Sequence, residues 1–303
     1  MSLKFLIIGD LHGQKPKIYF KDFDYIIAPG DFCSDKGLRP LTKKWMQVSN
    51  KKKMHFSSFL LKTIGKKKYE KLNTESLKVG RKILEYLNSF DKPVFIVPGN
   101  WDQSYRESKA DKEENDFYAR KYFLEAVMGN QTNQYLTKNL QNIYDCQYKL
   151  FKFGKFNIIG YGLSSNAENP KMKEDVYTKK QFILLTKKYK KLLSKLNMTY
   201  KNRNRNVPTI FLSHNVPNGT KLDILINKES EHHKKHFGST VALDFCKKYQ
   251  PLVCIGGHMH EHFGKDKIGK TTVINAGFGS YVNTLLEIEG NKIKKLRFYR
   301  GKH

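Results

Sequence analysis

The chain has 303 residues, of which 39% are hydrophobic, and a formal net charge of +28. It is long enough to bury a full core, and the absence of any apolar run of about 18 residues excludes a transmembrane helix. The four cysteines form no Cys-x-x-Cys pair and no signal-peptide pattern precedes the first apolar run, so we expect reduced thiols in a cytoplasmic protein.

The excess of basic residues has two explanations. It favours anionic partners such as nucleic acid, nucleotides or an anionic membrane surface. However, only eight of the 56 basic residues are arginine, and proteins that read bases usually rely on arginine more than this. A composition rich in Lys, Asn, Ile and Tyr is also what an AT-rich genome tends to produce. The charge therefore leaves nucleic-acid binding open.

Short apolar runs alternate with helical patterns in the first part of the chain. The runs at 4–8 and 25–28 predict strands that are buried on both faces. A lysine-rich segment at about 33–75 predicts a helical insertion, and the spacing of apolar residues over 76–90 predicts a helix. A third buried strand is expected at 94–97.

The later elements are predicted from the same kinds of apolar pattern. In chain order we expect a helix over 103–128, a hairpin over 147–161, a helix over 174–196, strands at 209–212, 252–255 and 272–274, and a hairpin over 284–299. The early strands alternate with helices, and hairpins come late in the chain. This order predicts one α/β domain over 1–303 with parallel central strands. Helical insertions are expected at about 33–75 and 103–145.

Five of the predicted strands are followed directly by a side chain that can bind a metal. These are Asp10, Asp31, Asn100, His214 and His258. The loops at the carboxyl ends of strands form the binding site in open α/β sheets, so we expect the five side chains to meet at one edge. His12 and His260 lie two residues beyond the first and the last of them.

These residue types suit two divalent ions. Carboxylate and amide oxygens mixed with imidazoles match Mn²⁺, Fe or Zn²⁺ better than Ca²⁺, which prefers oxygen alone. We expect Mn²⁺ first, with Fe, Zn²⁺, Ni²⁺ or Mg²⁺ as alternatives. Two ions about 4 Å apart can polarise a phosphoryl group and lower the pKa of a bridging water. Such a centre can attack a phosphate ester without a protein nucleophile.

The motifs resemble those of the calcineurin-like metallophosphoesterase superfamily, whose pattern is DxH, GD, GNH[DE], a lone His and GHxH. The corresponding segments here are GDLHG, PGD, PGNWD, SHN and GGHMHE, between Phe5 and about Gly277. The resemblance implies a four-layer α-β-β-α sandwich of two mixed sheets. It also implies ligand sets: Asp10, His12 and His260 for the first metal, Asn100, His214 and His258 for the second, and Asp31 as the bridge.

The sequence departs from the family pattern at one position. Trp101 stands where the family usually has a histidine that contacts the phosphate or protonates the leaving group, whereas Asp102 is kept. An indole can donate a hydrogen bond but cannot act as an acid. Loss of general acid catalysis, typically about 10²–10⁴-fold, need not abolish activity. Trp101 is predicted either as a packing residue at the rim or as a stacking platform for a nucleobase.

Two further residues are candidates for the site. Similar proteins often carry a His-x-Gly-Ser segment before the last motif, and His236 occupies that place here. His236 either replaces the missing acid or belongs to a solvated basic loop. With Asn100 and Asp102 it makes up the expected catalytic set, and Asn215 and Trp101 are the expected substrate contacts.

Together these observations predict a dinuclear metal-dependent phosphoesterase, more specifically a phosphodiesterase. A metal-bridging hydroxide would attack phosphorus in line. The substrate is a phosphate ester, with a nucleotide or nucleic acid as one form of it, and no membrane insertion is expected. One alternative is a nuclease acting on single-stranded or structured nucleic acid. Another is a non-catalytic binding scaffold, although such a protein should have lost metal ligands. The oligomeric state stays open.

Overall fold

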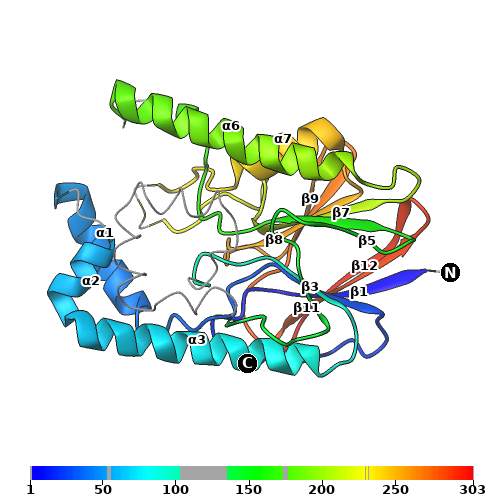
Figure 1. The fold of residues 1–303 in the computed structure, drawn as a ribbon, viewed down its shortest axis with the longest axis horizontal. Helices are drawn as coiled ribbons and strands as arrows, with labels where there is room; N and C mark the ends of the chain where they lie inside the picture. Colours follow the sequence, from blue (N-terminus) through cyan, green and yellow to red (C-terminus); the bar gives the residue numbers. More distant parts are fainter. Residues whose placement is uncertain are drawn as a thin grey trace.

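The computed structural model of the chain describes residues 2–52, 56–102, 135–172, 177–228, 230 and 232–302. Within these residues, two six-stranded β-sheets pack face to face, and helices cover the outer face of each sheet (Figure 1). This is a four-layer α-β-β-α sandwich, which confirms the predicted fold class. No helix of the described residues is long and apolar enough to span a membrane.

The first sheet has the strand order β12-β11-β1-β2-β3-β4. Strands β1 to β4 are parallel to one another, whereas β11 is antiparallel to both β1 and β12. The bounds are β1 (Leu3–Ile8), β2 (Tyr25–Ala28), β3 (Val94–Ile96), β4 (Ile143–Asp145), β11 (Val282–Glu289) and β12 (Lys292–Arg300). The parallel strands therefore all end at the same edge of the sheet.

The second sheet has the strand order β5-β6-β7-β8-β10-β9. Its four central strands are parallel, and the edge strands β5 and β9 are antiparallel to their neighbours. The bounds are β5 (Leu150–Lys152), β6 (Asn157–Tyr161), β7 (Thr209–Asn215), β8 (Val253–Gly257), β9 (Gly264–Ile268) and β10 (Thr271–Asn275). Both sheets are mixed, as the sequence motifs implied.

Five helices are present in the described residues. They are α1 (Arg39–Lys52), α2 (Phe56–Ile64), α3 (Lys66–Asn88), α6 (Lys179–Lys201) and α7 (Thr240–Tyr249). Helix α3 packs on the first sheet, and α6 and α7 pack on the second. A capping box starts α6: the Thr178 hydroxyl accepts from the Gln181 amide, and the Gln181 side chain accepts from the Thr178 amide.

Three apolar layers separate the sheets and helices. In β1, Phe5 and Ile7 face the layer between the two sheets, whereas Leu6 and Ile8 face the layer under α3. Successive side chains of a strand point to opposite faces, so both faces of β1 are buried. This explains why the run that forms β1 is apolar without interruption.

The helices differ in their limits from the predicted ones. The helix expected over 76–90 is the second half of α3, which begins at residue 66, so the segment at about 33–75 contains α1, α2 and the start of α3. The helix expected over 174–196 is α6, shifted toward the C-terminus. The helix expected over 103–128 lies outside the described residues. That the two segments are insertions into a single domain stays a prediction.

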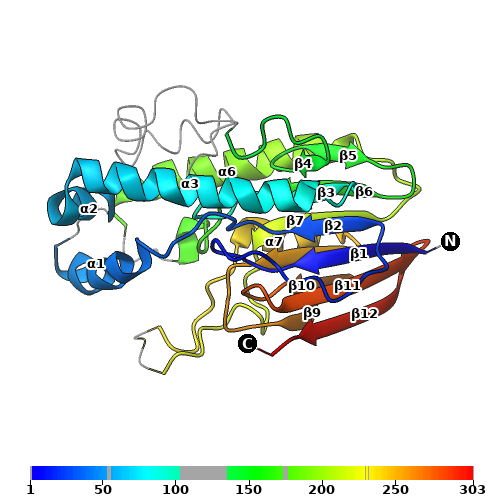
Figure 2. The same cartoon turned by 90° about the horizontal axis from the view of Figure 1, so that it is seen from below.

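One end of the sandwich carries additional structure. Helices α1 and α2 lie beyond the edge at which β1 ends, on the side opposite the N-terminus (Figure 2). The loops that follow the parallel strands open toward the same end. The polar residues that follow the strands in the sequence therefore gather between the sheets and these helices.

Candidate metal centre

The loops at the carboxyl ends of the parallel strands bring the candidate ligands together. The candidate ligand atoms form two groups, and within each group all the atoms lie within 4.8 Å of one another. The first group is Asp10, His12, Asp31 and His260, and the second is Asp31, His214 and His258. Asp10 follows β1, Asp31 follows β2 and His258 follows β8, while His214 is the penultimate residue of β7. Asp31 belongs to both groups, so its carboxylate lies where two ions could share it.

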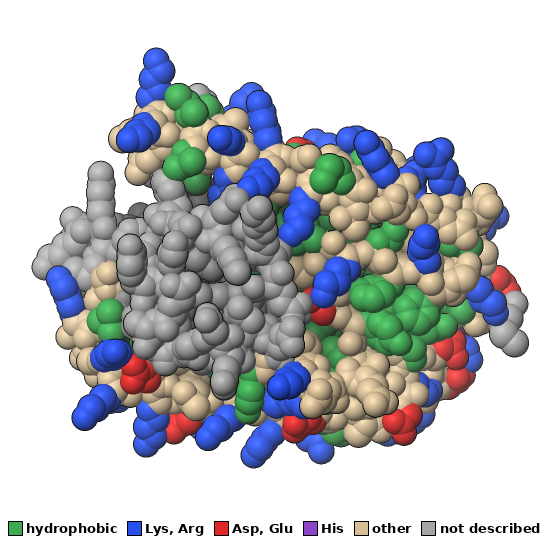
Figure 3. All heavy atoms as spheres, viewed as in Figure 1, with side chains coloured by type: hydrophobic (Ala, Val, Ile, Leu, Met, Phe, Trp, Pro, Cys, Tyr) green, Lys and Arg blue, Asp and Glu red, His purple; other side chains and the backbone are tan. Residues whose placement is uncertain are grey.

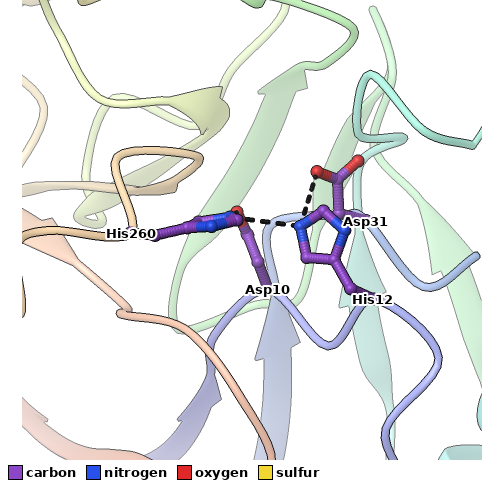
Figure 4. Close-up of side chains that lie close together, drawn as sticks. All are labelled: Asp10, His12, Asp31 and His260. Carbon is purple, nitrogen blue, oxygen red and sulfur yellow. Dashed lines mark hydrogen bonds and ion pairs between the residues drawn. The ribbon is translucent and has the colours of Figure 1, made fainter. Parts of the chain in front are cut away.

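The first group is held by short contacts (Figure 4). The His12 Nε2 atom lies 3.1 Å from His260 Nε2 and 3.2 Å from an Asp31 carboxylate oxygen. The His260 Nε2 atom lies 3.3 Å from Asp10 Oδ2. Two imidazoles and two carboxylates thus direct their ligand atoms into one small volume.

The second group has its histidine tautomers set by backbone carbonyls. The His214 Nδ1 atom donates to the Pro29 carbonyl over 2.8 Å, which leaves the Nε2 lone pair for a cation. That Nε2 atom lies 2.9 Å from Asn100 Oδ1 and 3.6 Å from Asp31 Oδ2. The His258 Nε2 atom donates to the Ser165 carbonyl over 3.0 Å, which leaves its Nδ1 atom for a metal.

The backbone around these ligands is unusual. His12, Asp31 and His258 have positive φ angles of 44°, 55° and 64°, a conformation that costs non-glycine residues about 1–3 kcal/mol each and persists only where the surroundings enforce it. Two glycines make room for the carboxylates. A Cβ atom at Gly257 would overlap Asp10, and one at Gly99 would overlap Asp31. The close approach of backbone to carboxylate therefore requires glycine at both positions.

The donor set fits divalent cations. Among the described residues, the buried oxygens Asp10 Oδ1 and Asp31 Oδ2 have no hydrogen-bond partner, and buried carboxylates without a counter-charge are strongly unfavourable. Burial lowers the pKa of His12, but the carboxylates of Asp31 and Asp35 outweigh it and raise the pKa to about 10. A proton on His12 can thus balance charge that a cation would otherwise balance.

The electrostatics of the second group are different. Burial, followed by the neighbouring His214, lowers the pKa of His258 to about 4. His258 is therefore neutral at pH 7, which is the protonation state that a metal requires of an imidazole.

Asp102 lies beneath the metal-binding loops. Its carboxylate accepts hydrogen bonds from the backbone amides of Asp31, Cys33 and Gly99 over 2.8–3.0 Å. Burial, followed by repulsion from Asp31, raises the pKa of Asp102 to about 6. The residue is fully buried and ties the loop after β2 to the loop after β3. We therefore expect Asp102 to position Asp31, and its catalytic role stays a prediction.

Trp101 lies at the rim, on the side of the helices. Its backbone amide donates to Asp31 Oδ1 over 2.8 Å, and its ring packs against the cluster of Leu38, Leu60 and Tyr69. The indole and the His12 ring meet edge-on with centroids 6.4 Å apart. This contact agrees with the packing alternative, and the stacking role stays a prediction.

Asn215 is the last residue of β7, and His236 lies in the segment between β7 and α7. The fully buried Asp223 accepts a hydrogen bond from His236 Nδ1 over 2.7 Å and others from the amides of Gly219, Thr220 and Gly238. The His236 side chain is 40% exposed. Asn215 is fully buried and donates to the Phe237 carbonyl over 2.8 Å. Asn215 therefore anchors this loop, and its contact with substrate stays a prediction.

Three residues at the site were not predicted from the sequence. Asp35 Oδ2 lies 3.1 Å from His12 Nδ1, and the Arg39 guanidinium pairs with the same carboxylate. The Phe278 ring stacks on His260 with centroids 4.2 Å apart. The i, i+4 spacing of Asp35 and Arg39 was the available signal for an ion pair at a helix start. Phe278 had no signal beyond its place after the strand β10.

Comparisons with known proteins identify the family and the fold of the chain. The family model described as calcineurin-like phosphoesterase matches residues 3–262. One crystal structure is 17% identical, covers 100% of this chain and 100% of its own, and has a TM-score of 0.60, which shows a shared fold.

Two other solved structures are more distant. TT1561 of Thermus thermophilus is 14% identical, with 99% coverage of both chains and a TM-score of 0.43. A putative 5′-nucleotidase from Staphylococcus aureus is 11% identical over 99% of this chain and 54% of its own, with a TM-score of 0.47. No protein with a curated description matches the chain.

Proposed function

This chain belongs to the calcineurin-like phosphoesterase family, and on that premise we propose that it is a dinuclear metal-dependent phosphodiesterase. The observation that carries the proposal is the Asp31 carboxylate, which is common to two groups of ligand atoms. The first metal would be bound by Asp10, His12 and His260, the second by Asn100, His214 and His258. We propose Mn²⁺ as the working metal. We also propose a cytoplasmic location, which is supported by the four buried free cysteines.

The protein contributes a fixed frame for the reaction. When bound, the two ions would polarise the phosphoryl group and lower the pKa of water, so that hydroxide can attack phosphorus. Asp102 holds the backbone on both sides of Asp31, and Pro29 and Ser165 fix the tautomers of His214 and His258. Fixed ligands and tautomers limit the reorganisation that the reaction requires.

Trp101 supports a diester over a monoester as the substrate. A monoester carries close to two negative charges at pH 7, because its second pKa is about 6, whereas a diester carries one. An indole at the rim supplies no positive charge, unlike a protonated imidazole at the same position. The smaller local charge should favour the singly charged diester.

The test measures the hydrolysis of two chromogenic substrates by the metal-free protein and by the protein after reconstitution with Mn²⁺. We expect hydrolysis of bis(p-nitrophenyl) phosphate with a higher kcat/KM than that of p-nitrophenyl phosphate, and no activity after chelation. A preference for the monoester would refute the diester proposal. Absence of hydrolysis with Mn²⁺, Fe, Zn²⁺, Ni²⁺ and Mg²⁺ would favour the binding scaffold.

A further inference from the structure

A pocket of about 530 Å³ opens directly beside the first ligand group. His12 forms part of its wall, and Phe278, which stacks on His260, forms another part. The rest of the lining includes the segment that follows Asp31 and the start of α1, with Lys36, Arg39 and Lys43. The pocket therefore connects the candidate metal centre with a basic wall that the family motifs do not include.

The basic wall has two distinct parts. Arg39 is held by the Asp35 carboxylate, which also contacts His12, so its charge is largely balanced. Lys36 and Lys43 are exposed, and neither forms an ion pair with a described residue. Asp35 is buried and occupied by two partners. The net charge that this pocket offers to a ligand is therefore positive.

The start of α1 forms part of the same wall. Arg39 and Pro40 are the first two residues of the helix, and both line the pocket. The ammonium groups of Lys36 and Lys43 favour a phosphate group over neutral groups. The ring of Phe278 lies between this wall and the metal ligands, and gives the pocket an apolar side against which an organic spacer can lie.

We infer that this pocket binds a second phosphate group of the substrate, separated by a nucleoside from the phosphate that is hydrolysed. The inference rests on the proposed phosphodiesterase function and narrows its substrate class to short oligonucleotides that carry a terminal phosphate. The scissile phosphate lies at the metal centre, the nucleoside passes Phe278, and Lys36 and Lys43 bind the second phosphate. The volume is of the size that holds one nucleotide.

The kinetic test uses a dinucleotide with and without the additional phosphate. Thymidylyl-thymidine (TpT) has only the scissile diester, whereas pTpT and TpTp carry one further phosphate at the 5′ or the 3′ end. We expect the wild-type protein with Mn²⁺ to have a higher kcat/KM for pTpT or TpTp than for TpT. The double variant Lys36→Gln and Lys43→Gln should lower that preference about tenfold, because the loss of each exposed cation should lower it about threefold.

Lys44 provides a matched control, since it lies beside Lys43 on α1, is exposed and does not line the pocket. The Lys44→Gln variant should keep the wild-type preference. An equal loss in Lys44→Gln would show that the general surface charge is responsible, and an unchanged preference in the double variant would refute the inference.

A binding measurement separates this inference from the proposed function. Thymidine 3′,5′-bisphosphate is titrated into metal-free protein and followed by calorimetry. We expect weaker binding to the double variant than to wild type or Lys44→Gln, even if no substrate is hydrolysed. Equal binding to all three proteins would refute the pocket. If no diester is hydrolysed but the bisphosphate binds more weakly to the double variant, only the proposed phosphodiesterase function is refuted.

Discussion

His258 and His260 are separated by one residue, yet they belong to different ligand groups. His260 contacts Asp10 and His12, whereas His258 belongs with Asp31 and His214. We predict that His258→Ala and His260→Ala each nearly abolish hydrolysis and each reduce the metal content from about two ions to one. The measurements are kcat and the metal content by elemental analysis. His262→Ala, whose ring donates to the Ile224 carbonyl, serves as the control, and near-wild-type turnover in either variant would contradict the assignment.

Asp35 is expected to act through His12. Its carboxylate lies 3.1 Å from His12 Nδ1 and should orient the ring so that Nε2 faces the metal. We predict that Asp35→Ala lowers the affinity for the metals about 10–100-fold. A competition titration with a chelating dye measures this affinity. Arg39→Ala removes the ion pair between Arg39 and Asp35 but leaves the Asp35 carboxylate beside His12, so it should have a much smaller effect on the metal affinity. Equal effects of the two variants would exclude the positioning role.

His236 is the candidate for the acid that Trp101 cannot supply. Asp223 holds its Nδ1 atom, so a proton could be delivered only from Nε2. We predict that His236→Ala lowers kcat much more for diesters with poor alkoxide leaving groups than for nitrophenyl esters, which need no protonation. His232→Ala, on the same loop, should affect both substrates alike. Equal losses on both substrates in His236→Ala would remove the residue from the acid role.

The gathering of five candidate ligands at one edge could be predicted, because each of them follows an apolar run in the sequence. Strand burial and the common edge of parallel strands then determine where Asp10, Asp31 and His258 lie. Asp35 and Phe278 could not be predicted, because their contacts with His12 and His260 depend on how α1 and the loop after β10 fold over the site. No local pattern in the sequence encodes that arrangement.

At the scale of elements, the strands with two buried faces were predicted, and so were the edge strands β5 and β12 as parts of the expected hairpins, whereas the edge strands β4 and β9 were not. The strand β9 reads Gly-Lys-Asp-Lys-Ile, with only half-exposed or exposed side chains, and pairs on one side only. Such a strand has no apolar pattern, because it contributes little to the core. The start of α3 was also missed, since its first two turns are rich in lysine and pack mainly through Tyr69 and Asn73.

Strand β8 ends in a glycine that the site requires. A Cβ atom at Gly257 would overlap the Asp10 carboxylate, so Gly257→Ala must displace either β8 or Asp10. We predict a loss of about 1–3 kcal/mol in the free energy of unfolding of the metal-free protein, and a much lower metal affinity. Urea unfolding measures the first effect without the metals. Gly264→Ala, where nothing lies within 4 Å of the new Cβ, is the control. An unchanged stability of Gly257→Ala would contradict the packing described for Asp10.

At the scale of the whole molecule, the chain has a formal net charge of +28. On the face shown in Figure 3, lysine and arginine side chains of the described residues are scattered over both layers of helices and over the strands. A protein that tracks a long polyanion would instead gather its cations along one groove. On this face the cations of the described residues do not gather along one groove, and the pocket beside His12 has a short basic wall of Lys36, Arg39 and Lys43. We therefore expect a small substrate rather than a nucleic-acid polymer.

This distribution predicts a shallow dependence of activity on salt. The logarithm of kcat/KM for a short diester should fall with the logarithm of the salt concentration with a slope of about −1 to −2, because two lysines would release few counterions from the substrate. A nuclease that binds a polymer through six or more phosphates would show a slope steeper than about −4. The measurement compares pTpT with single-stranded DNA between low and physiological salt, in the presence of Mn²⁺. Because the same protein and metal are used for both substrates, effects of salt on the metal centre cancel in the comparison. A steep slope with single-stranded DNA, together with a higher kcat/KM than for pTpT, would show that the dispersed charge acts collectively and that the nuclease alternative is correct.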